Sequence, residues 1–251
     1  MRANMSVIRR AGRTLLRPLA ARVIPPPCRR QSSDTYLESF ILQHTEVGTD
    51  HLTPELRLLL LTPRCSYWRL RPEHWPYSDP YWAIYWPGGQ ALARYLLDHP
   101  EIVQHKRVLD LGCGCGATAI AAQMGGASYV LANDIDPVAG TALALNCRLN
   151  GQEPLHFLSE DMIGGDECRW GLITLGDMFY EEQLADRLHP WLRRCTERYG
   201  TAVLIGDPGR GQFVDHPIQK WLQKLAEYSL PESSKQENFG LTSTAVWRYR
   251  P

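Results

Sequence analysis

The segment Val108-Leu109-Asp110-Leu111-Gly112-Cys113-Gly114-Cys115-Gly116-Ala117 decides the fold class of this 251-residue chain. A short apolar run leads into three glycines at alternate positions, and a helical pattern over 117–124 follows. A strand that turns through glycines into a helix is where doubly wound α/β folds bind nucleotides, because a ligand can lie against bare backbone there. The segment therefore predicts an α/β fold with a nucleotide-type cofactor at this turn.

Asp110 indicates which cofactor this is. The pattern Gly112-x-Gly114-x-x-Ala117 also satisfies the dinucleotide fingerprint, but a carboxylate two residues before the first glycine opposes the charge of a pyrophosphate. S-adenosyl-L-methionine has no phosphate and carries a sulfonium and an ammonium, which an acid attracts. We therefore expect Asp110, Gly112 and Gly114 to bind S-adenosyl-L-methionine. The alternative is that Asp110 only caps the turn.

Apolar runs and helical patterns alternate through the second half of the chain, which is typical of a parallel sheet with helices on both faces. We expect strands at 108–111, 129–133, 155–158, 172–175 and 202–205, and helices at 117–124, 137–150 and 182–199. A helix over 217–225 then precedes strands at 227–230 and 242–249, which a loop joins and which must pair antiparallel. The fold expected for 101–251 is Rossmann-like: a mostly parallel seven-stranded sheet with a terminal antiparallel hairpin.

Residues 34–100 form an N-terminal extension, which we expect to complete the cofactor and substrate sites. Short helices are predicted at 34–43 and 54–61, and a further helix is predicted to open at Gly88-Gly89 and run through 97. The aromatic-rich stretch 67–86 contains three prolines and precedes Pro87, which excludes a regular helix and a central strand there.

Residues 1–33 have the composition of a mitochondrial transit peptide that is removed after import. They contain eight arginines and no acidic residue, and Ile8, Ala11, Leu15 and Leu19 share one helical face. The alternatives are a disordered basic tail or a nucleic-acid-binding arm. This pattern predicts a mitochondrial matrix protein that engages the import machinery, with Pro25-Pro26-Pro27 ending the segment.

The remaining chain is acidic, with 19 basic and 27 acidic side chains and a net charge of −8. This charge argues against a nucleic-acid partner and suits a cationic one. No apolar run approaches the ~18 residues of a membrane span, so membrane insertion is not expected. Cys113 and Cys115 lack a second ligand pair at zinc spacing, and no metal site is predicted.

An acidic residue at the end of the second strand, Asp134, is placed to accept hydrogen bonds from ribose hydroxyls. Asp136 is expected to cap the helix that Pro137 begins. The position of Asp134 suits NAD as well as S-adenosyl-L-methionine.

Several motifs resemble known methyltransferases. The stretch 110–116 resembles the first motif of the seven-strand class I methyltransferases, and 177–180 (Asp-Met-Phe-Tyr) fits the D-x-x-Y pattern of a family of lysine methyltransferases that modify non-histone proteins. The stretches 79–89 and 205–210 resemble one branch of that family, which acts on the electron transfer flavoprotein beta subunit in mitochondria. The resemblance covers roughly 34–251. It implies a protein-lysine N-methyltransferase with that subunit as substrate.

The resemblance also implies roles for individual residues. Trp86 is placed beside the cofactor, and Gly176 and Asp161 join the cofactor-binding residues, Asp161 at the adenine. Either acid of Glu160-Asp161 is alternatively a solvated turn residue.

Asp177 and Tyr180 are the expected catalytic residues. A lysine with a pKa of about 10.4 is almost entirely protonated at neutral pH, so the site must capture an ammonium and let it lose a proton. We expect Asp177 to capture and orient the amine and Tyr180 to help line its channel. Alternatively, Asp177 caps the following helix and Tyr180 is a core residue. Two other functions stay open: a small-molecule or RNA methyltransferase, and a non-catalytic scaffold with this fold.

Overall fold

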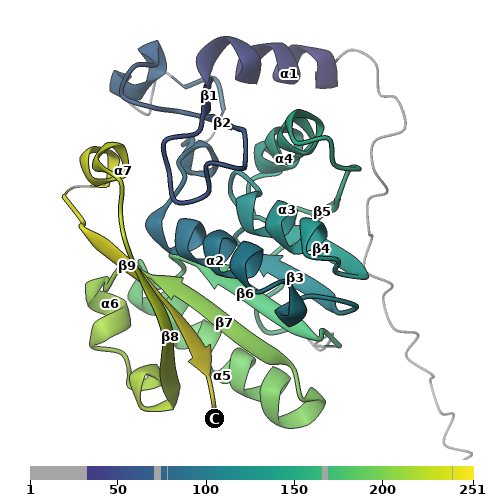
Figure 1. Cartoon of the computed structure of the whole chain (residues 1–251), viewed down its shortest axis with the longest axis vertical. Coiled ribbons are helices and arrows are strands. Elements are labelled where there is room, and N and C mark those ends of the chain that lie inside the picture. Colours follow the sequence, from purple (N-terminus) through teal and green to yellow (C-terminus); the bar gives the residue numbers. More distant parts are fainter. Residues whose placement is uncertain (1–32, 71–74, 78, 166–168, 239) are drawn as a thin grey trace, which may run out of the picture.

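The structure of the protein is a computed structural model that describes residues 33–70, 75–77, 79–165, 169–238 and 240–251 (Figure 1). The predicted transit peptide, apart from Ser33, lies outside the described residues. Within them, no helix is both long and apolar enough to cross a lipid bilayer.

A seven-stranded sheet in the order β5-β4-β3-β6-β7-β9-β8 forms the centre of the fold. Its strands are β3 (Arg107–Leu111), β4 (Tyr129–Asn133), β5 (His156–Leu158), β6 (Leu172–Gly176), β7 (Ala202–Asp207), β8 (Leu222–Ser229) and β9 (Ser243–Tyr249). The first five strands of that order run parallel, and β9 pairs antiparallel with both β7 and β8. The predicted Rossmann-like sheet with a terminal antiparallel hairpin is confirmed.

Helices cover both faces of this sheet (Figure 1). They are α2 (Pro87–Asp98), α3 (Ala117–Met124), α4 (Pro137–Leu149), α5 (Glu182–Tyr199) and the short α6 (Gly211–Val214) and α7 (Glu232–Glu237). Successive strand residues point to opposite faces: Val108 packs in the cluster with α2 and α3, and Leu109 packs in the cluster with α5. The central strands β3, β4, β6 and β7 are mostly apolar because both of their faces are buried.

Local signals fix the ends of several helices. Asp136 caps α4 as predicted, because its side chain accepts a hydrogen bond from the backbone N–H of Val138 and Pro137 takes the first helical position. Helix α5 ends at Gly200, whose φ of 67° is the left-handed conformation that commonly terminates a helix.

The N-terminal extension folds over α4. Helix α1 (Ser33–His44) is followed by a two-stranded antiparallel sheet of β1 (Glu46–Gly48) and β2 (Leu58–Leu60), and by the 3-10 turns η1 (Ser66–Arg69) and η3 (Tyr81–Ala83). Residues of α1, β2 and η3 share one apolar cluster with α4. A further 3-10 turn, η4 (Pro100–Ile102), links α2 to β3.

Two predicted helices are wrong. The segment 54–61 contains strand β2, because Leu58–Leu60 pairs with β1 and all three leucines are buried. The segment 217–225 contains the 3-10 turn η5 (Pro217–Trp221) and then β8, whose amide groups pair along β9. The loop between β8 and β9 also holds α7, which we did not predict.

Candidate active site

The glycine-rich turn after β3 exposes bare backbone at the carboxyl edge of the sheet. Gly112, Gly114 and Gly116 have φ values of 67°, 50° and 83°, in the left-handed region that favours glycine. A Cβ on Gly112 would lie 2.4 Å from Met178 Sδ, and one on Gly116 would lie 2.3 Å from Leu143 Cδ1. The left-handed backbone conformation therefore favours glycine at all three positions, and a side chain at Gly112 or Gly116 would also displace the end of Met178 or Leu143.

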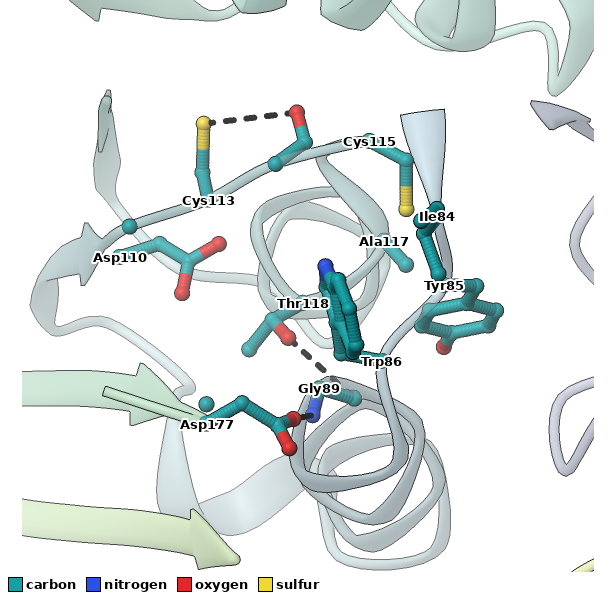
Figure 2. Close-up of a pocket in the computed structure, with 13 residues that line it drawn as sticks. Ile84, Tyr85, Trp86, Gly89, Asp110, Cys113, Cys115, Ala117, Thr118 and Asp177 are labelled. Atoms are coloured by element: carbon teal, nitrogen blue, oxygen red, sulfur yellow. Dashed lines mark hydrogen bonds between the residues drawn. The ribbon is translucent and has the colours of Figure 1, made fainter. Parts of the chain in front are cut away.

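A pocket opens between this turn, the ends of β3 and β6, and the amino termini of α2 and α3 (Figure 2). It brings together residues that are far apart in the sequence. Its lining contains Ile84, Tyr85, Trp86, Gly89, Asp110, Gly112, Cys113, Gly114, Cys115, Ala117, Thr118, Gly176 and Asp177. Six of the predicted site residues lie in this list: Trp86, Asp110, Gly112, Gly114, Gly176 and Asp177.

Asp110 leaves one carboxylate oxygen unpaired inside the pocket. Its Oδ1 accepts a hydrogen bond of 2.9 Å from Thr174 Oγ1, whereas its buried Oδ2 has no hydrogen-bond partner among the described residues. Burial raises the pKa of this carboxyl to about 7. The carboxyl group points toward the pocket interior (Figure 2). A buried oxygen without a donor suits a ligand that brings a cationic N–H group.

Asp134 supports the glycine turn from the end of β4. Its Oδ2 accepts a hydrogen bond of 2.9 Å from the N–H of Gly114, and its Oδ1 accepts one of 3.0 Å from the N–H of Asp136. Burial raises its pKa. A carboxylate has about four acceptor positions, so two donors leave capacity for ligand hydroxyls.

Asp161 is bound to its own loop and to helix α5. It is exposed, accepts a hydrogen bond of 3.0 Å from the N–H of Ile163, and forms an ion pair with Arg187 of α5. The structure does not place it among the residues that line the pocket. Its contact with adenine stays a prediction.

Asp177 is buried and fully hydrogen-bonded within the protein. Its Oδ2 accepts from the N–H groups of Gly88 and Gly89 at 2.5 and 3.1 Å. Its Oδ1 accepts from Arg210 Nη2 and Nε at 2.7 and 3.2 Å. Burial raises the pKa of Asp177, and the Arg210 charge acts in the opposite direction. These four donors fill the roughly four acceptor positions of the carboxylate, so none is left for a substrate amine in this conformation.

Glycines let the amino terminus of α2 reach the ends of β6 and β7. A Cβ on Gly88 would lie 2.2 Å from the carbonyl oxygen of Gly206, and one on Gly206 would lie 2.0 Å from that of Gly88. A Cβ on Gly176 would lie 2.7 Å from the amide nitrogen of Gly89. Asp177 thus accepts from the first N–H groups of a helix that begins 90 residues earlier, and its negative charge suits that helix end.

Trp86 and Tyr180 differ in their exposure. Trp86 lines the pocket (Figure 2), and its Nε1 donates to the carbonyl oxygen of Tyr81 at 2.9 Å. Tyr180 is 54% exposed, which contradicts a core role, and it lies outside the pocket lining. Partial burial raises its pKa, and Glu181, Asp134 and Tyr81 add to that shift. Tyr180 therefore stands on the outer surface near Asp134 and Tyr81.

Arg210 and Thr118 are site residues that we did not predict. Arg210 follows β7 and reaches Asp177, and its guanidinium carbon lies 5.4 Å from the centre of the Trp86 ring. Thr118 of α3 lines the pocket and donates to the carbonyl oxygen of Gly89 at 3.4 Å. The sequence singles out Arg210 only as part of the stretch 205–210. Nothing in that stretch indicates a contact with Asp177, because the contact forms only when the fold brings the ends of β6 and β7 together.

The two cysteines of the turn are buried thiols. Burial raises the pKa of Cys113 well above its usual range and that of Cys115 to about 12, so both stay protonated at neutral pH. In the described part of the chain, no group of three or more His, Cys, Asp or Glu side chains is arranged to hold a metal ion.

Comparison with known proteins gives three findings. Residues 91–168 match the family model described as ribosomal protein L11 methyltransferase (PrmA). The chain is 64% identical over 222 residues to the electron transfer flavoprotein beta subunit lysine methyltransferase of Xenopus laevis, covering 88% of this chain and 90% of that protein. It is 58% identical over 219 residues to the protein of the same name from Homo sapiens, covering 87% and 84%.

Among solved structures, the chain is similar to a ribosomal protein L11 methylase from Lactobacillus delbrueckii subsp. bulgaricus. The sequences are 23% identical, the TM-score is 0.48, and the match covers 65% of this chain and 80% of that one.

Proposed function

The chain belongs to the electron transfer flavoprotein beta subunit lysine methyltransferases, which use S-adenosyl-L-methionine, and on this premise we propose that it methylates lysines of that beta subunit in the mitochondrial matrix. The observation that carries the proposal is the pocket at the ends of β3 and β6. It combines a buried carboxylate oxygen without a donor, a turn of bare backbone and an aromatic wall.

The residues present fit S-adenosyl-L-methionine. Asp110 Oδ2 offers a buried negative acceptor, and Gly112 and Gly114 offer backbone without side chains in the pocket lining. We assign Asp110, Gly112 and Gly114 to the cofactor, with Gly176 and Trp86 as further walls of the pocket and Asp134 as the acceptor for ribose hydroxyls. When bound, the cofactor supplies an electrophilic methyl group on a sulfonium.

The protein has to bring an uncharged amine into line with that methyl group and keep water away from it. Trp86 and Asp177 line the pocket, and the 54% exposed Tyr180 lies outside it, on the surface from which a lysine side chain has to enter. We assign Tyr180 and the neighbouring Tyr81 to the entrance of the lysine channel. An amine deprotonates more easily once it passes from this exposed entrance into the buried pocket, because burial disfavours its charged form.

Asp177 acts on the amine indirectly in this proposal. Its internal donors occupy its acceptor positions, so a direct bond to a substrate ammonium requires that Arg210 first leave. We therefore assign Asp177 to holding the start of α2, and with it Trp86, in place at the pocket.

The mitochondrial location rests on residues 1–33. Eight arginines without an acid, on an amphipathic pattern, are the chemistry that the import machinery recognises. The net charge of −8 on 34–251 favours a protein partner with basic segments over a nucleic acid. The proposal includes no membrane insertion.

Labelling purified electron transfer flavoprotein with the full chain and radioactive S-adenosyl-L-methionine tests this function. We expect label on lysines of the beta subunit, located by mass spectrometry, and loss of label when those lysines are changed to arginine. Asp110→Asn should remove most of the activity. Asp186→Asn, whose side chain is 70% exposed on α5, serves as the matched control. The same reaction is also run on a mitochondrial extract. If it labels another protein and leaves the beta subunit unlabelled, the substrate assignment is refuted.

A further inference from the structure

Arg210 connects three parts of the pocket wall. Its guanidinium donates from Nη2 and Nε to Asp177 Oδ1, at 2.7 and 3.2 Å, and lies 5.4 Å from the centre of the Trp86 ring. Asp177 in turn binds the first amides of α2. A single side chain from the end of β7 therefore reaches both the end of β6 and the residue before α2.

The loop that carries Arg210 is fixed by Asp207. The buried Asp207 accepts hydrogen bonds on Oδ1 from the N–H groups of Gly209 and Arg210, at 2.7 and 2.8 Å. Gly209 has a φ of 94°, a conformation that L side chains rarely adopt. These bonds hold the Arg210 backbone in one position, so its side chain projects toward Asp177.

A guanidinium is suited to this position and an ammonium is not. Its planar group donates two hydrogen bonds in a fixed geometry while one face lies against an aromatic ring. The side chain of Arg210 is 23% exposed and that of Asp177 is 6% exposed, so solvent does not replace these contacts.

We infer that Arg210 is a positioning residue for methyl transfer, which sets the Asp177 carboxylate and the Trp86 ring at the acceptor side of the pocket. This inference rests on the proposed function. Arg210 itself need not touch the cofactor or the lysine. Its loss displaces the aromatic wall, and a misplacement of about 1 Å at a reacting centre slows catalysis by about 10²-fold.

If Arg210 instead competed with the substrate amine, a different kinetic result would be expected. Arg210 occupies the two groups, Asp177 Oδ1 and the face of Trp86, that a substrate ammonium would use. If it were a competitor that has to leave, removing it would lower the KM for the protein substrate without lowering kcat.

The experiment compares Arg210→Lys and Arg210→Ala with Arg94→Ala. Arg94 is the matched control, because it lies in α2, is 17% exposed, and pairs with Glu55 and Asp98 away from the pocket. We expect Arg210→Ala to reduce kcat by about 10²-fold and Arg210→Lys by about tenfold, with the Kd for S-adenosylhomocysteine within about threefold of wild type. Arg94→Ala should lower Tm without lowering kcat.

Two readouts separate positioning from stability. Millimolar guanidinium should partly restore kcat in Arg210→Ala and have no such effect on Arg94→Ala. Fluorine NMR of fluorotryptophan-labelled protein, with Trp86→Phe used to assign the signal, should show the Trp86 resonance shifted in Arg210→Ala and unchanged in Arg94→Ala.

The inference is overturned if Arg210→Ala keeps the wild-type kcat, if it gains activity through a lower KM, or if its Trp86 resonance does not move. The NMR readout needs no protein substrate. It therefore decides the role of Arg210 even if wild-type enzyme leaves the beta subunit unmethylated, which would refute the proposed function alone.

Discussion

Two buried aspartates in one pocket have opposite surroundings. Asp110 has one oxygen bonded to Thr174 and one without a donor, and no cationic side chain within the described residues pairs with it. Asp177 has four donors, two of them from Arg210. A buried carboxylate that lacks a cation attracts one, and a buried carboxylate already paired supports structure. The same residue type therefore has two roles, which the local partners decide.

The raised pKa of Asp110 predicts that cofactor affinity depends on pH. Its pKa is raised to about 7, so the carboxyl is mostly protonated below that pH and ionised above it. A bound cation favours the ionised form, so cofactor affinity should rise with pH up to about 7, by at most tenfold per unit, and then level off. Calorimetry between about pH 6 and pH 8 measures this profile.

Asp110→Asn is the control for that profile, because Asp207 also has a pKa raised to about 7. The variant should bind S-adenosylhomocysteine with about 1.5–3 kcal/mol less free energy and with a flatter pH dependence. The same slope in the variant as in wild type would assign the titration to another group.

Asp177→Asn should destabilise the protein. An amide keeps the shape of the carboxyl, but its NH₂ group must face either Arg210 or the N–H groups of Gly88 and Gly89, and a donor facing donors loses those bonds. Breaking a buried ion pair costs about 3–5 kcal/mol, and the 23% exposure of Arg210 places the expected loss near the lower end, at about 3 kcal/mol. Urea unfolding measures it. A variant as stable as wild type would show that the Asp177–Arg210 pair contributes little.

Strands and helices with strong periodicity could be predicted from the sequence. Strands β3 and β4 and helices α3 and α5 begin and end within one residue of the predicted bounds, because apolar runs alternate there with amphipathic helices. The leucine run before residue 62 suits a buried helix and a buried strand equally, and only its pairing with β1 decides. The first half of β8, residues 222–225, was predicted as helix and the strand was predicted only from 227, because β8 is an edge strand without fully buried positions and with a bulge near Lys224.

The part of the site that directly follows a single strand could be predicted from the sequence. Asp110, Gly112 and Gly114 follow β3 directly, and the topology alone takes them to the pocket. The contact of Asp177 with Arg210 joins the ends of two different strands, and its contact with Gly88 joins a third element. No spacing within one segment encodes such contacts, so the sequence predicted the presence of Asp177 in the pocket and not its partners.

The packing of α2 on β7 is expected to depend on Gly206. In Gly206→Ala, the Cβ would lie 2.0 Å from the carbonyl oxygen of Gly88, so the helix must move away from the sheet. We expect a loss of about 2–3 kcal/mol in the free energy of unfolding. We also expect a weaker Kd for S-adenosylhomocysteine, because the backbone of Gly89 in the pocket lining moves with the whole helix. Gly211→Ala is the matched control, since nothing lies within 4 Å of its added Cβ. Equal urea midpoints for the two variants would contradict this account of the helix contact.

The N-terminal extension and the methyltransferase domain share one core. Leu92 and Leu96 of α2 lie in the same apolar cluster as Val108 of β3 and Val246 of β9. The predicted boundary at residue 100 therefore divides the sequence and not the core: α2 covers the sheet and presents Trp86 and Gly89 to the pocket. The sign of the net charge changes at a different place, about residue 33, where an arginine-rich segment is followed by an acidic remainder.

That division of charge gives the last prediction. A fluorescent protein fused behind residues 1–33 should enter mitochondria, because an amphipathic segment with eight arginines and no acid presents a positive face beside an apolar one. Changing the arginines to glutamate keeps the apolar face and reverses the charge, so import should be lost. The full chain without residues 1–33 should stay in the cytosol and still methylate the purified beta subunit, since the described lining of the pocket is supplied by residues between Ile84 and Asp177. A cytosolic wild-type fusion would refute the matrix location and leave the enzyme activity intact, whereas an inactive truncated chain would show that residues 1–33 do more than direct import.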